Sequence, residues 1–145
     1  MKLLLTGKMG IGKSTILNKA INKYNIKYGI FTKKSDKYLY AYLLNSNKKY
    51  IIGEKTLLGM SINYAGFELI TYELKKITFP DFFVVDEIGF LEEKYVPYLN
   101  ELERIIEESR NFIGIIRLFF HERYYFLKDL PIIEITEENR ENIEL

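Results

Sequence analysis

The chain has 145 residues, no cysteine and a formal net charge of +1, and 48% of its residues are hydrophobic. This length indicates one domain over residues 1–145, which can bury roughly two-thirds of the surface of its unfolded chain. The lack of cysteine excludes disulfides and thiolate metal sites, and the apolar runs are too short to span a bilayer. We therefore expect a cytoplasmic protein without membrane contact.

The charge is divided unevenly along the chain. Residues 1–80 hold 14 lysines and four acidic residues, whereas residues 81–145 hold seven basic and 16 acidic residues. A basic segment favours polyanions, so a nucleotide and a nucleic acid both stay open as partners. We favour the simpler interpretation that the two halves pair or are solvated in the fold, and we do not favour nucleic acid.

The chain begins with a predicted strand over residues 2–6 and a predicted helix over residues 13–24, whose apolar residues recur at helical spacing. The segment between them fits the phosphate-loop pattern G-x-x-x-x-G-K-[ST]. A strand, a glycine-rich turn and a helix aim backbone N–H groups and a helix N-terminus at a polyphosphate. We therefore expect a nucleotide-binding loop formed by Gly7, Lys8, Met9, Gly10, Ile11, Gly12, Lys13, Ser14 and Thr15.

The next segments predict a strand over residues 29–32 and a β-hairpin of residues 38–44 and 50–52. A hairpin is not part of a minimal alternating α/β unit, so we expect it as an addition at one edge of a sheet. Its three tyrosines and neighbouring lysine could stack bases, but we favour the interpretation that they form the packed face of the hairpin. These residues are Tyr38, Tyr40, Tyr42 and Lys37.

The second half of the chain continues the alternation of helix and strand. The continuous apolar run Phe82 to Val85 is typical of a parallel strand buried on both faces, and it ends at Asp86 and Glu87. Thr136 is a good N-cap for a closing helix. The other elements expected from composition and periodicity are a strand at 59–63, a helix at 67–77, a helix at 96–109, a strand at 112–116 and a strand at 131–135.

This order of elements predicts an α/β fold with a mostly parallel sheet covered on both faces. Ligands then bind at the carboxyl ends of the strands. That edge carries the phosphate loop, Asp86 with Glu87, and Arg117, which ends the 112–116 strand. We expect this strand to lie between the phosphate-loop strand and the Asp86 strand.

Four side chains have predicted roles in phosphate chemistry. Lys13 is expected along the β- and γ-phosphates, and the Ser14 hydroxyl and Asp86 carboxylate are expected to hold Mg²⁺. Glu87 follows on the same strand but points in another direction, so it can polarise a water beside the γ-phosphate as a general base.

Arg117 has two interpretations that we leave open. A cation at the end of its strand can stabilise the transition-state charge on the γ-phosphate, and it can equally be an ordinary surface arginine.

Four blocks of the sequence resemble the nucleoside-triphosphatase family first known from thermophiles. They follow the family's order and are Gly7 to Thr15, Tyr28 to Thr32, Val85 to Glu92 and Glu134 to Arg140. The resemblance implies a three-layer P-loop NTPase fold with RecA-like strand order, and Mg²⁺-dependent hydrolysis of nucleoside triphosphates with limited base selectivity. It also supports Glu87 as the base and adds Glu92 and Arg140 as motif residues.

The chain departs from the family pattern in the region that follows the second strand. Lys33 and Lys34 stand where acidic residues are usual, and the tyrosine-rich hairpin replaces a basic segment. Arg117 stands where the family strand usually ends in a histidine. None of these changes touches the residues expected to bind phosphate.

The sequence thus predicts an enzyme that hydrolyses ATP, GTP and, with limited selectivity, CTP and UTP, and we favour a monomer. One alternative is a small-molecule or nucleotide kinase, against which the lack of arginine before position 104 counts. The other is a nucleic-acid-associated or switch ATPase, which the basic first half of the chain motivates.

Overall fold

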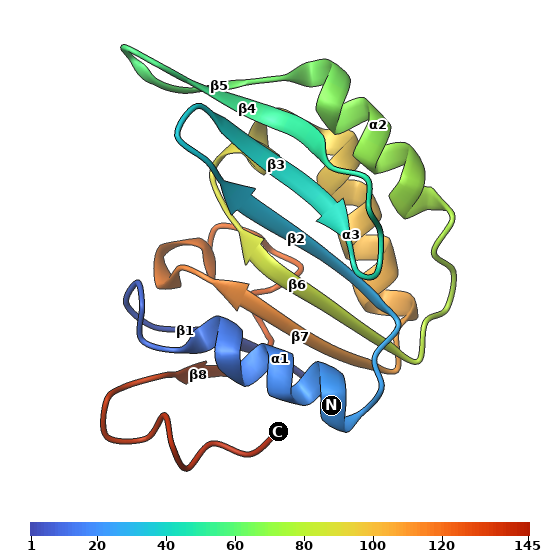
Figure 1. Cartoon of the computed structure of the whole chain (residues 1–145). Helices are drawn as coiled ribbons and strands as arrows, with labels where there is room; N and C mark the ends of the chain where they lie inside the picture. The colour runs from blue at the N-terminus through green and yellow to red at the C-terminus, as the bar shows by residue number, and fades with distance from the viewer.

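The computed structural model describes residues 1–145 and is built on one eight-stranded sheet, in the spatial order β5-β4-β3-β2-β6-β7-β1-β8 (Figure 1). The strands in chain order are β1 (Lys2–Thr6), β2 (Tyr28–Lys34), β3 (Tyr38–Leu43), β4 (Tyr50–Thr56), β5 (Gly59–Ile62), β6 (Phe82–Ile88), β7 (Asn111–Ile116) and β8 (Ile132–Glu134).

The sheet has a parallel part and an antiparallel part. Strands β2, β6, β7, β1 and β8 pair in parallel, whereas β3 and β4 pair antiparallel beyond β2 and β5 adds a third antiparallel strand. The α/β fold and the edge hairpin predicted from the sequence are therefore confirmed, and β7 lies between β1 and β6 as expected.

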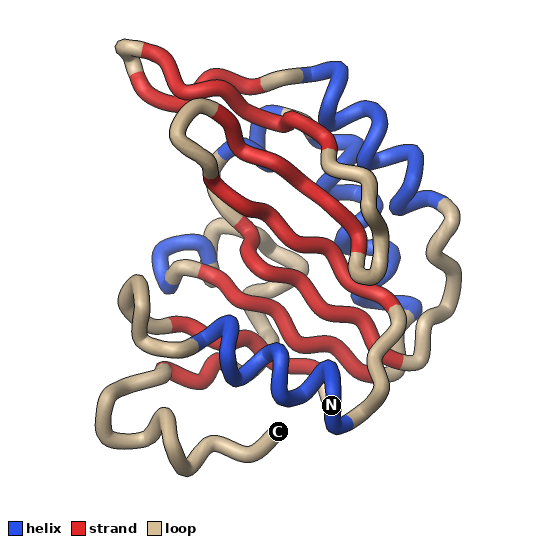
Figure 2. The backbone as a smooth tube through the Cα atoms, in the orientation of Figure 1, coloured by secondary structure: helices blue, strands red, loops and turns tan.

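Three α-helices cover the sheet from two sides and make three layers. α1 (Lys13–Lys23) crosses one face over the parallel strands, and α2 (Tyr64–Lys75) and α3 (Val96–Glu108) lie on the other face (Figures 1 and 2). Short 3₁₀ turns occupy residues 91–94 and 118–120. No helix is long and apolar enough to pass through a membrane.

Each face of the sheet has its own hydrophobic core. The larger core joins α2 and α3 to the sheet and includes Phe67, Leu102 and Phe112, all fully buried. The smaller core lies under α1 and includes Leu17 and Val84. Because parallel strands β1, β6 and β7 contribute to both cores, their sequences are continuous apolar runs rather than alternating ones.

Helix α2 begins three residues earlier than predicted, at Tyr64. The Asn63 side chain accepts a hydrogen bond from the Gly66 amide at 2.9 Å and so caps the first turn. A Cβ on Gly66 would lie 1.5 Å from the Ile51 carbonyl oxygen, so only glycine lets the helix lie this close to β4. The sequence pattern of apolar residues could not show this contact.

Two local predictions were wrong. Residues 137–142 form turns rather than a closing helix, although Thr136 does accept the expected cap-type hydrogen bond, from the Asn139 amide at 3.2 Å. The three tyrosines of β3 do not form its packed face: Leu39, Ala41 and Leu43 contact the larger core, and the tyrosines alternate with them on the opposite face.

Candidate active site

The phosphate loop connects β1 to α1 at the carboxyl edge of the sheet. Gly10 and Gly12 have φ of +77° and +116°, which glycine adopts without the penalty that a side chain would bring. A Cβ on Gly7 would come within 2.8 Å of the Ile135 carbonyl oxygen, so the loop lies against the end of β8. The backbone conformation and this close approach explain why glycine stands at these three positions of the loop.

The loop leaves a set of hydrogen-bond donors unused. α1 begins without a side-chain cap, and the backbone amides of Gly12, Lys13, Ser14 and Thr15 donate no hydrogen bond within the chain. The Lys13 ammonium group folds back onto the carbonyl oxygens of Gly7 and Lys8, the second at 3.2 Å. Unpaired amides at a helix N-terminus and a nearby cation form a strong anion-binding arrangement.

Ser14 and Asp86 meet across the sheet edge. The Ser14 hydroxyl donates a hydrogen bond to the Asp86 carboxylate at 2.7 Å, although 72 residues separate them. Burial raises the pKa of Asp86 above its ordinary value, and the Ser14 hydrogen bond and the Lys13 charge oppose this rise. Two predicted members of the site are therefore in direct contact.

These two oxygen atoms fit a small hard cation. Mg²⁺ prefers oxygen ligands and is commonly held by one or two protein groups together with substrate phosphates and water. No cluster of three or more His, Cys, Asp or Glu residues surrounds the position, so the protein offers no complete cage. Ser14 and Asp86 thus suit a cation that arrives with a polyphosphate.

Glu87 follows Asp86 near the end of β6, and its carboxylate lies beside the guanidinium group of Arg117. The pairing of β6 with β7 skips one residue here: Asp86 pairs with Ile115 and Ile88 with Ile116, so Glu87 is an extra residue. An irregularity of this kind redirects a side chain away from the regular alternation. The Glu87 carboxylate is 3.7 Å from the Arg117 guanidinium, and the Glu87 amide donates to the Thr32 hydroxyl at 3.4 Å.

A buried acid supports the loop that follows Glu87. The Glu92 carboxylate accepts a hydrogen bond from the Gly89 amide at 3.0 Å, and the Tyr124 hydroxyl donates to the Gly89 carbonyl at 2.9 Å. Glu92 is only 2% exposed, and this burial raises its pKa to about 7. Glu92 therefore holds the backbone next to Glu87, and its side chain fixes the turn that ends β6.

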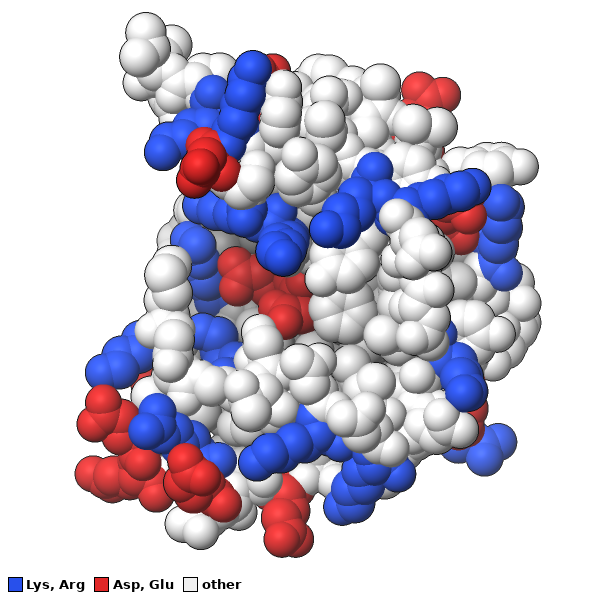
Figure 3. Space-filling view, viewed as in Figure 1, with Lys and Arg blue, Asp and Glu red and all other residues white.

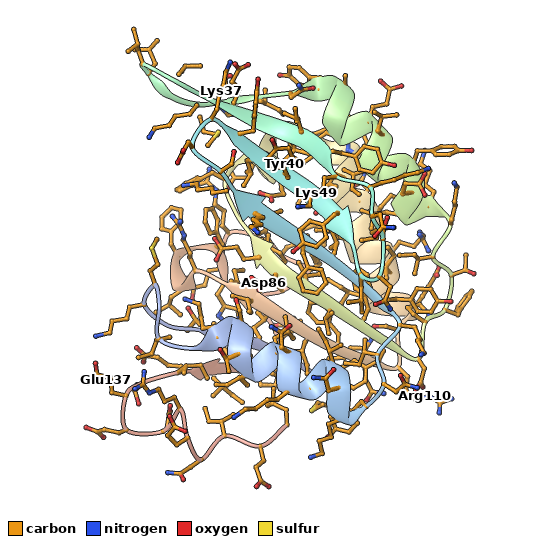
Figure 4. The ribbon with its side chains drawn as sticks, viewed as in Figure 1. Lys37, Tyr40, Lys49, Asp86, Arg110 and Glu137 are labelled. Atoms are coloured by element: carbon orange, nitrogen blue, oxygen red, sulfur yellow. The ribbon has the colours of Figure 1, made fainter.

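Asp86 and Glu87, the acidic pair, lie in a hollow that basic side chains border in part. Figure 3 shows acidic atoms at the bottom of a central depression with basic side chains above and to the left of it, where Figure 4 labels Asp86 in the same view. A cavity of about 360 Å³ adjoins the pair; its lining includes Met9, Lys34 and Arg117, together with Glu87. Its volume exceeds that of a single water molecule, and its walls combine apolar and charged groups.

The terminal block of the sequence supports the loop from the other side. Thr136 and Asn139 exchange two hydrogen bonds, and the Asn139 amide group also donates to the Glu134 carbonyl at 2.9 Å. The Lys8 ammonium is 3.7 Å from Glu137, in a pair that is mostly exposed. Arg140 is exposed and contacts Glu141 at 3.6 Å, so it does not reach the acidic pair in this structure.

The structure thus brings the predicted residues to one sheet edge. Lys13, Ser14, Asp86, Glu87 and Arg117 all lie there, and Ser14 contacts Asp86 while Glu87 contacts Arg117. Sequence reasoning missed Thr32 and Tyr124, because a hydroxyl that contacts one backbone group leaves no periodic or spacing signal. Glu92 was named from the family resemblance as a motif residue, and its contact with the Gly89 amide comes from the structure.

Comparisons with known proteins identify the family and the fold of the chain. The family model described as NTPase matches residues 2–145. The nucleoside-triphosphatase THEP1 of Thermotoga maritima is 23% identical over 158 aligned residues, which cover 99% of this chain and 91% of that protein. The crystal structure of THEP1 from the hyperthermophile Aquifex aeolicus superimposes with a TM-score of 0.68 at 22% identity, covering 99% of this chain and 94% of that one.

Proposed function

The chain belongs to the NTPase family and is a nucleoside-triphosphatase, and from this premise we propose that it hydrolyses ATP, GTP, CTP and UTP in a Mg²⁺-dependent reaction. The products are the nucleoside diphosphate and phosphate. One observation carries the proposal: Asp86 is hydrogen-bonded to Ser14 of the phosphate loop at 2.7 Å, and the next residue, Glu87, adjoins the cavity.

Binding of the substrate is assigned to the phosphate loop. The free amides of the first turn of α1 and the loop surround the phosphates, and Lys13 exchanges its carbonyl contacts for phosphate oxygens. Ser14 and Asp86 would hold Mg²⁺, which neutralises charge on the phosphates when it is bound.

Glu87 and Arg117 are assigned to the chemical step. The Glu87 carboxylate orients a water molecule and takes its proton as the water oxygen forms a bond to the γ-phosphorus. The bond between the γ-phosphorus and the bridging oxygen breaks, and the diphosphate leaves with that electron pair. Arg117, 3.7 Å from Glu87, is close enough to stabilise the negative charge on the transferred group.

The direct test is phosphate release from each of the four triphosphates with Mg²⁺ and no other addition. We expect turnover with all four and none when EDTA removes the metal. Lys13→Ala is expected to lower kcat/KM by about 10⁴-fold, because binding and charge stabilisation are lost together. The matched control is Lys19→Ala, an exposed lysine on the same helix, which keeps turnover. Equal rates for both variants would remove Lys13 from the site.

A second candidate is phosphoryl transfer to a small-molecule hydroxyl. The cavity of about 360 Å³ beside Glu87 favours it, since an acceptor would occupy the attacking side of the γ-phosphate. Hydrolysis gives equal amounts of diphosphate and free phosphate. If an added hydroxyl compound raises diphosphate formation without raising free phosphate, the protein also transfers the phosphoryl group to that acceptor.

A further inference from the structure

The antiparallel strands carry a row of aromatic side chains on the face that no helix covers. Tyr38, Tyr40 and Tyr42 alternate with the core residues of β3 and are half-buried. α1 lies over the parallel strands on this side, and no helix lies in front of β2, β3 and β4 (Figure 1). We call these tyrosines, with Lys33, Lys37 and Lys49, the tyrosine–lysine face.

Neighbouring rings hold the tyrosines in place. Tyr42 stacks on Phe31 of β2 with ring centroids 5.6 Å apart, and Tyr38 meets Tyr40 edge-on at 6.0 Å. Residues two apart on a strand are separated by about 6.5–7 Å, so the three rings form a regular series along β3. Rings that are already ordered lose little conformational freedom when a flat ligand stacks on them.

Lysines are interleaved with these rings. Lys33 is the strand partner of Tyr40, Lys37 lies 5.3 Å from the Tyr38 ring centroid and Lys49 lies 5.9 Å from that of Tyr42. All three are exposed. Figure 4 shows Lys37 and Lys49 at the two ends of the row with Tyr40 between them.

The local charge is strongly positive. Residues 27–55 contain seven lysines and two acidic residues, Asp36 and Glu54. Glu54 pairs with Lys37 at 3.8 Å, with side chains 47% and 63% exposed, so solvent screens this pair and it neutralises little of the surface charge. The face therefore combines positive charge with flat aromatic surface.

We propose that the tyrosine–lysine face binds single-stranded nucleic acid, with bases stacked on Tyr40 and Tyr42 and phosphates contacted by Lys33, Lys37 and Lys49. An open sheet face with aromatic side chains on adjacent positions is a known platform for two or three unpaired bases. Stacking is tolerant of sequence because every base has a π-face, and lysines follow the backbone. A duplex keeps its bases stacked internally and cannot use the rings.

The test measures binding without any nucleoside triphosphate, so it is independent of the proposed hydrolysis. Fluorescein-labelled 12-nucleotide oligo-U RNA and oligo-dT DNA are titrated with the protein by fluorescence anisotropy, from 50 to 300 mM NaCl. We expect both strands to bind, with a slope of log K against log salt near −2, the value for about three neutralised phosphates. Tighter binding of RNA would indicate contacts to the 2′-hydroxyl groups.

Variants of the face separate stacking from charge. Tyr40→Ala with Tyr42→Ala is expected to weaken binding at least tenfold, whereas Tyr40→Phe with Tyr42→Phe keeps it, because phenylalanine retains the ring. Lys33→Gln with Lys49→Gln is expected to reduce the magnitude of the salt slope by about 1.4.

The control variant is Tyr72→Ala with Lys76→Ala. This pair has the same chemistry, with the Lys76 ammonium 4.7 Å from the Tyr72 ring, but it lies on and just after α2, on the other side of the sheet. We expect unchanged binding. Circular dichroism melting of every variant verifies that it is folded.

Three results would overturn the proposal. One is no binding of either strand at 50 mM NaCl, and another is equal affinity of the wild type and the tyrosine-to-alanine variant. The third is self-association of the wild type in sedimentation velocity that the same variant abolishes, because the face would then be covered by a second copy.

Discussion

The two parts of the sheet follow opposite designs. In the parallel part, β1, β6 and β7 are buried on both faces along most of their length, and Asp86 and Glu87 are partly exposed near the end of β6. In the antiparallel part, β3 presents one face to the larger core and leaves the other without a covering helix. The candidate site of the first part therefore lies at an edge of the sheet, whereas the second part offers an open surface.

The two parts of the sheet also differ in how their exposed side chains are held in place. The parallel edge holds Ser14, Asp86, Glu87 and Arg117 through contacts between distant segments, so a small displacement would disturb all of them. The open face holds its side chains by simple alternation along one strand. Substitutions at the carboxyl edge of the parallel strands should therefore affect turnover strongly, and substitutions at the tip of the β4–β5 hairpin should not.

Glu87→Gln is the substitution at the carboxyl edge with the largest expected effect on turnover. The amide cannot accept the proton of water, so kcat is expected to fall by about 10²- to 10⁴-fold while nucleotide affinity changes less than about threefold. Phosphate release and titration with a fluorescent nucleotide measure the two quantities. Glu122→Gln, at an exposed position, is the control and keeps kcat. Turnover within twofold of wild type for Glu87→Gln would exclude Glu87 as the base.

Glu92→Gln tests the buried carboxylate next to the site through the pH dependence of the free energy of unfolding. The pKa of Glu92 in the folded protein, about 7, lies above its ordinary value of 4.5 because of burial. Its contribution to stability is therefore complete below about pH 4.5 and is lost as the pH rises through about 7. The glutamine variant stays neutral and is expected to gain about 3 kcal/mol over wild type between pH 4.5 and pH 8.

Urea unfolding of both proteins at several pH values measures this gain. The raised pKa of Asp86 affects both proteins alike and cancels in the difference. Glu122→Gln again serves as the control, with no pH-dependent difference from wild type. Parallel curves of stability against pH for Glu92→Gln and wild type would show that Glu92 is ionised normally.

Arg117→Ala has a smaller expected effect at the same edge. Arg117 is 52% exposed, so solvent screens its charge and we expect a decrease in kcat of about tenfold rather than the larger loss typical of an enclosed arginine. The matched control is Arg110→Ala, because Arg110 precedes β7 at its other end and is 84% exposed. Equal turnover of the two variants would assign Arg117 to the surface.

Leu57→Ser with Leu58→Ser tests the antiparallel part and has the smallest expected effect. Both side chains are fully exposed at the tip of the β4–β5 hairpin. Phosphate release is expected within about twofold of wild type, and the free energy of unfolding within about 0.5 kcal/mol. A larger loss of turnover would mean that the extension takes part in the reaction and is not accessory to it.

The sequence predicted the parallel part better than the rest of the chain. Glycine spacing, continuous apolar runs and the acids at the end of β6 are local signals, and each depends on residues that are adjacent in the chain. The error at residues 137–142 has a physical cause. The Thr136 and Asn139 side chains each accept a hydrogen bond from the other residue's backbone amide. These bonds lie within one turn, so the capping interaction forms without a helix after it.

The sequence by itself predicted a phosphate-binding loop and the strand that carries the acidic pair, because backbone geometry at glycine and burial of parallel strands impose strict residue patterns. Only the tertiary structure decided that Asp86 contacts Ser14, that Glu92 is buried beneath Gly89, and that the tyrosines of β3 face away from the core. Alternation along a strand fixes which residues share a face. The alternation does not show which face the helices cover, since that depends on packing between segments far apart in the chain.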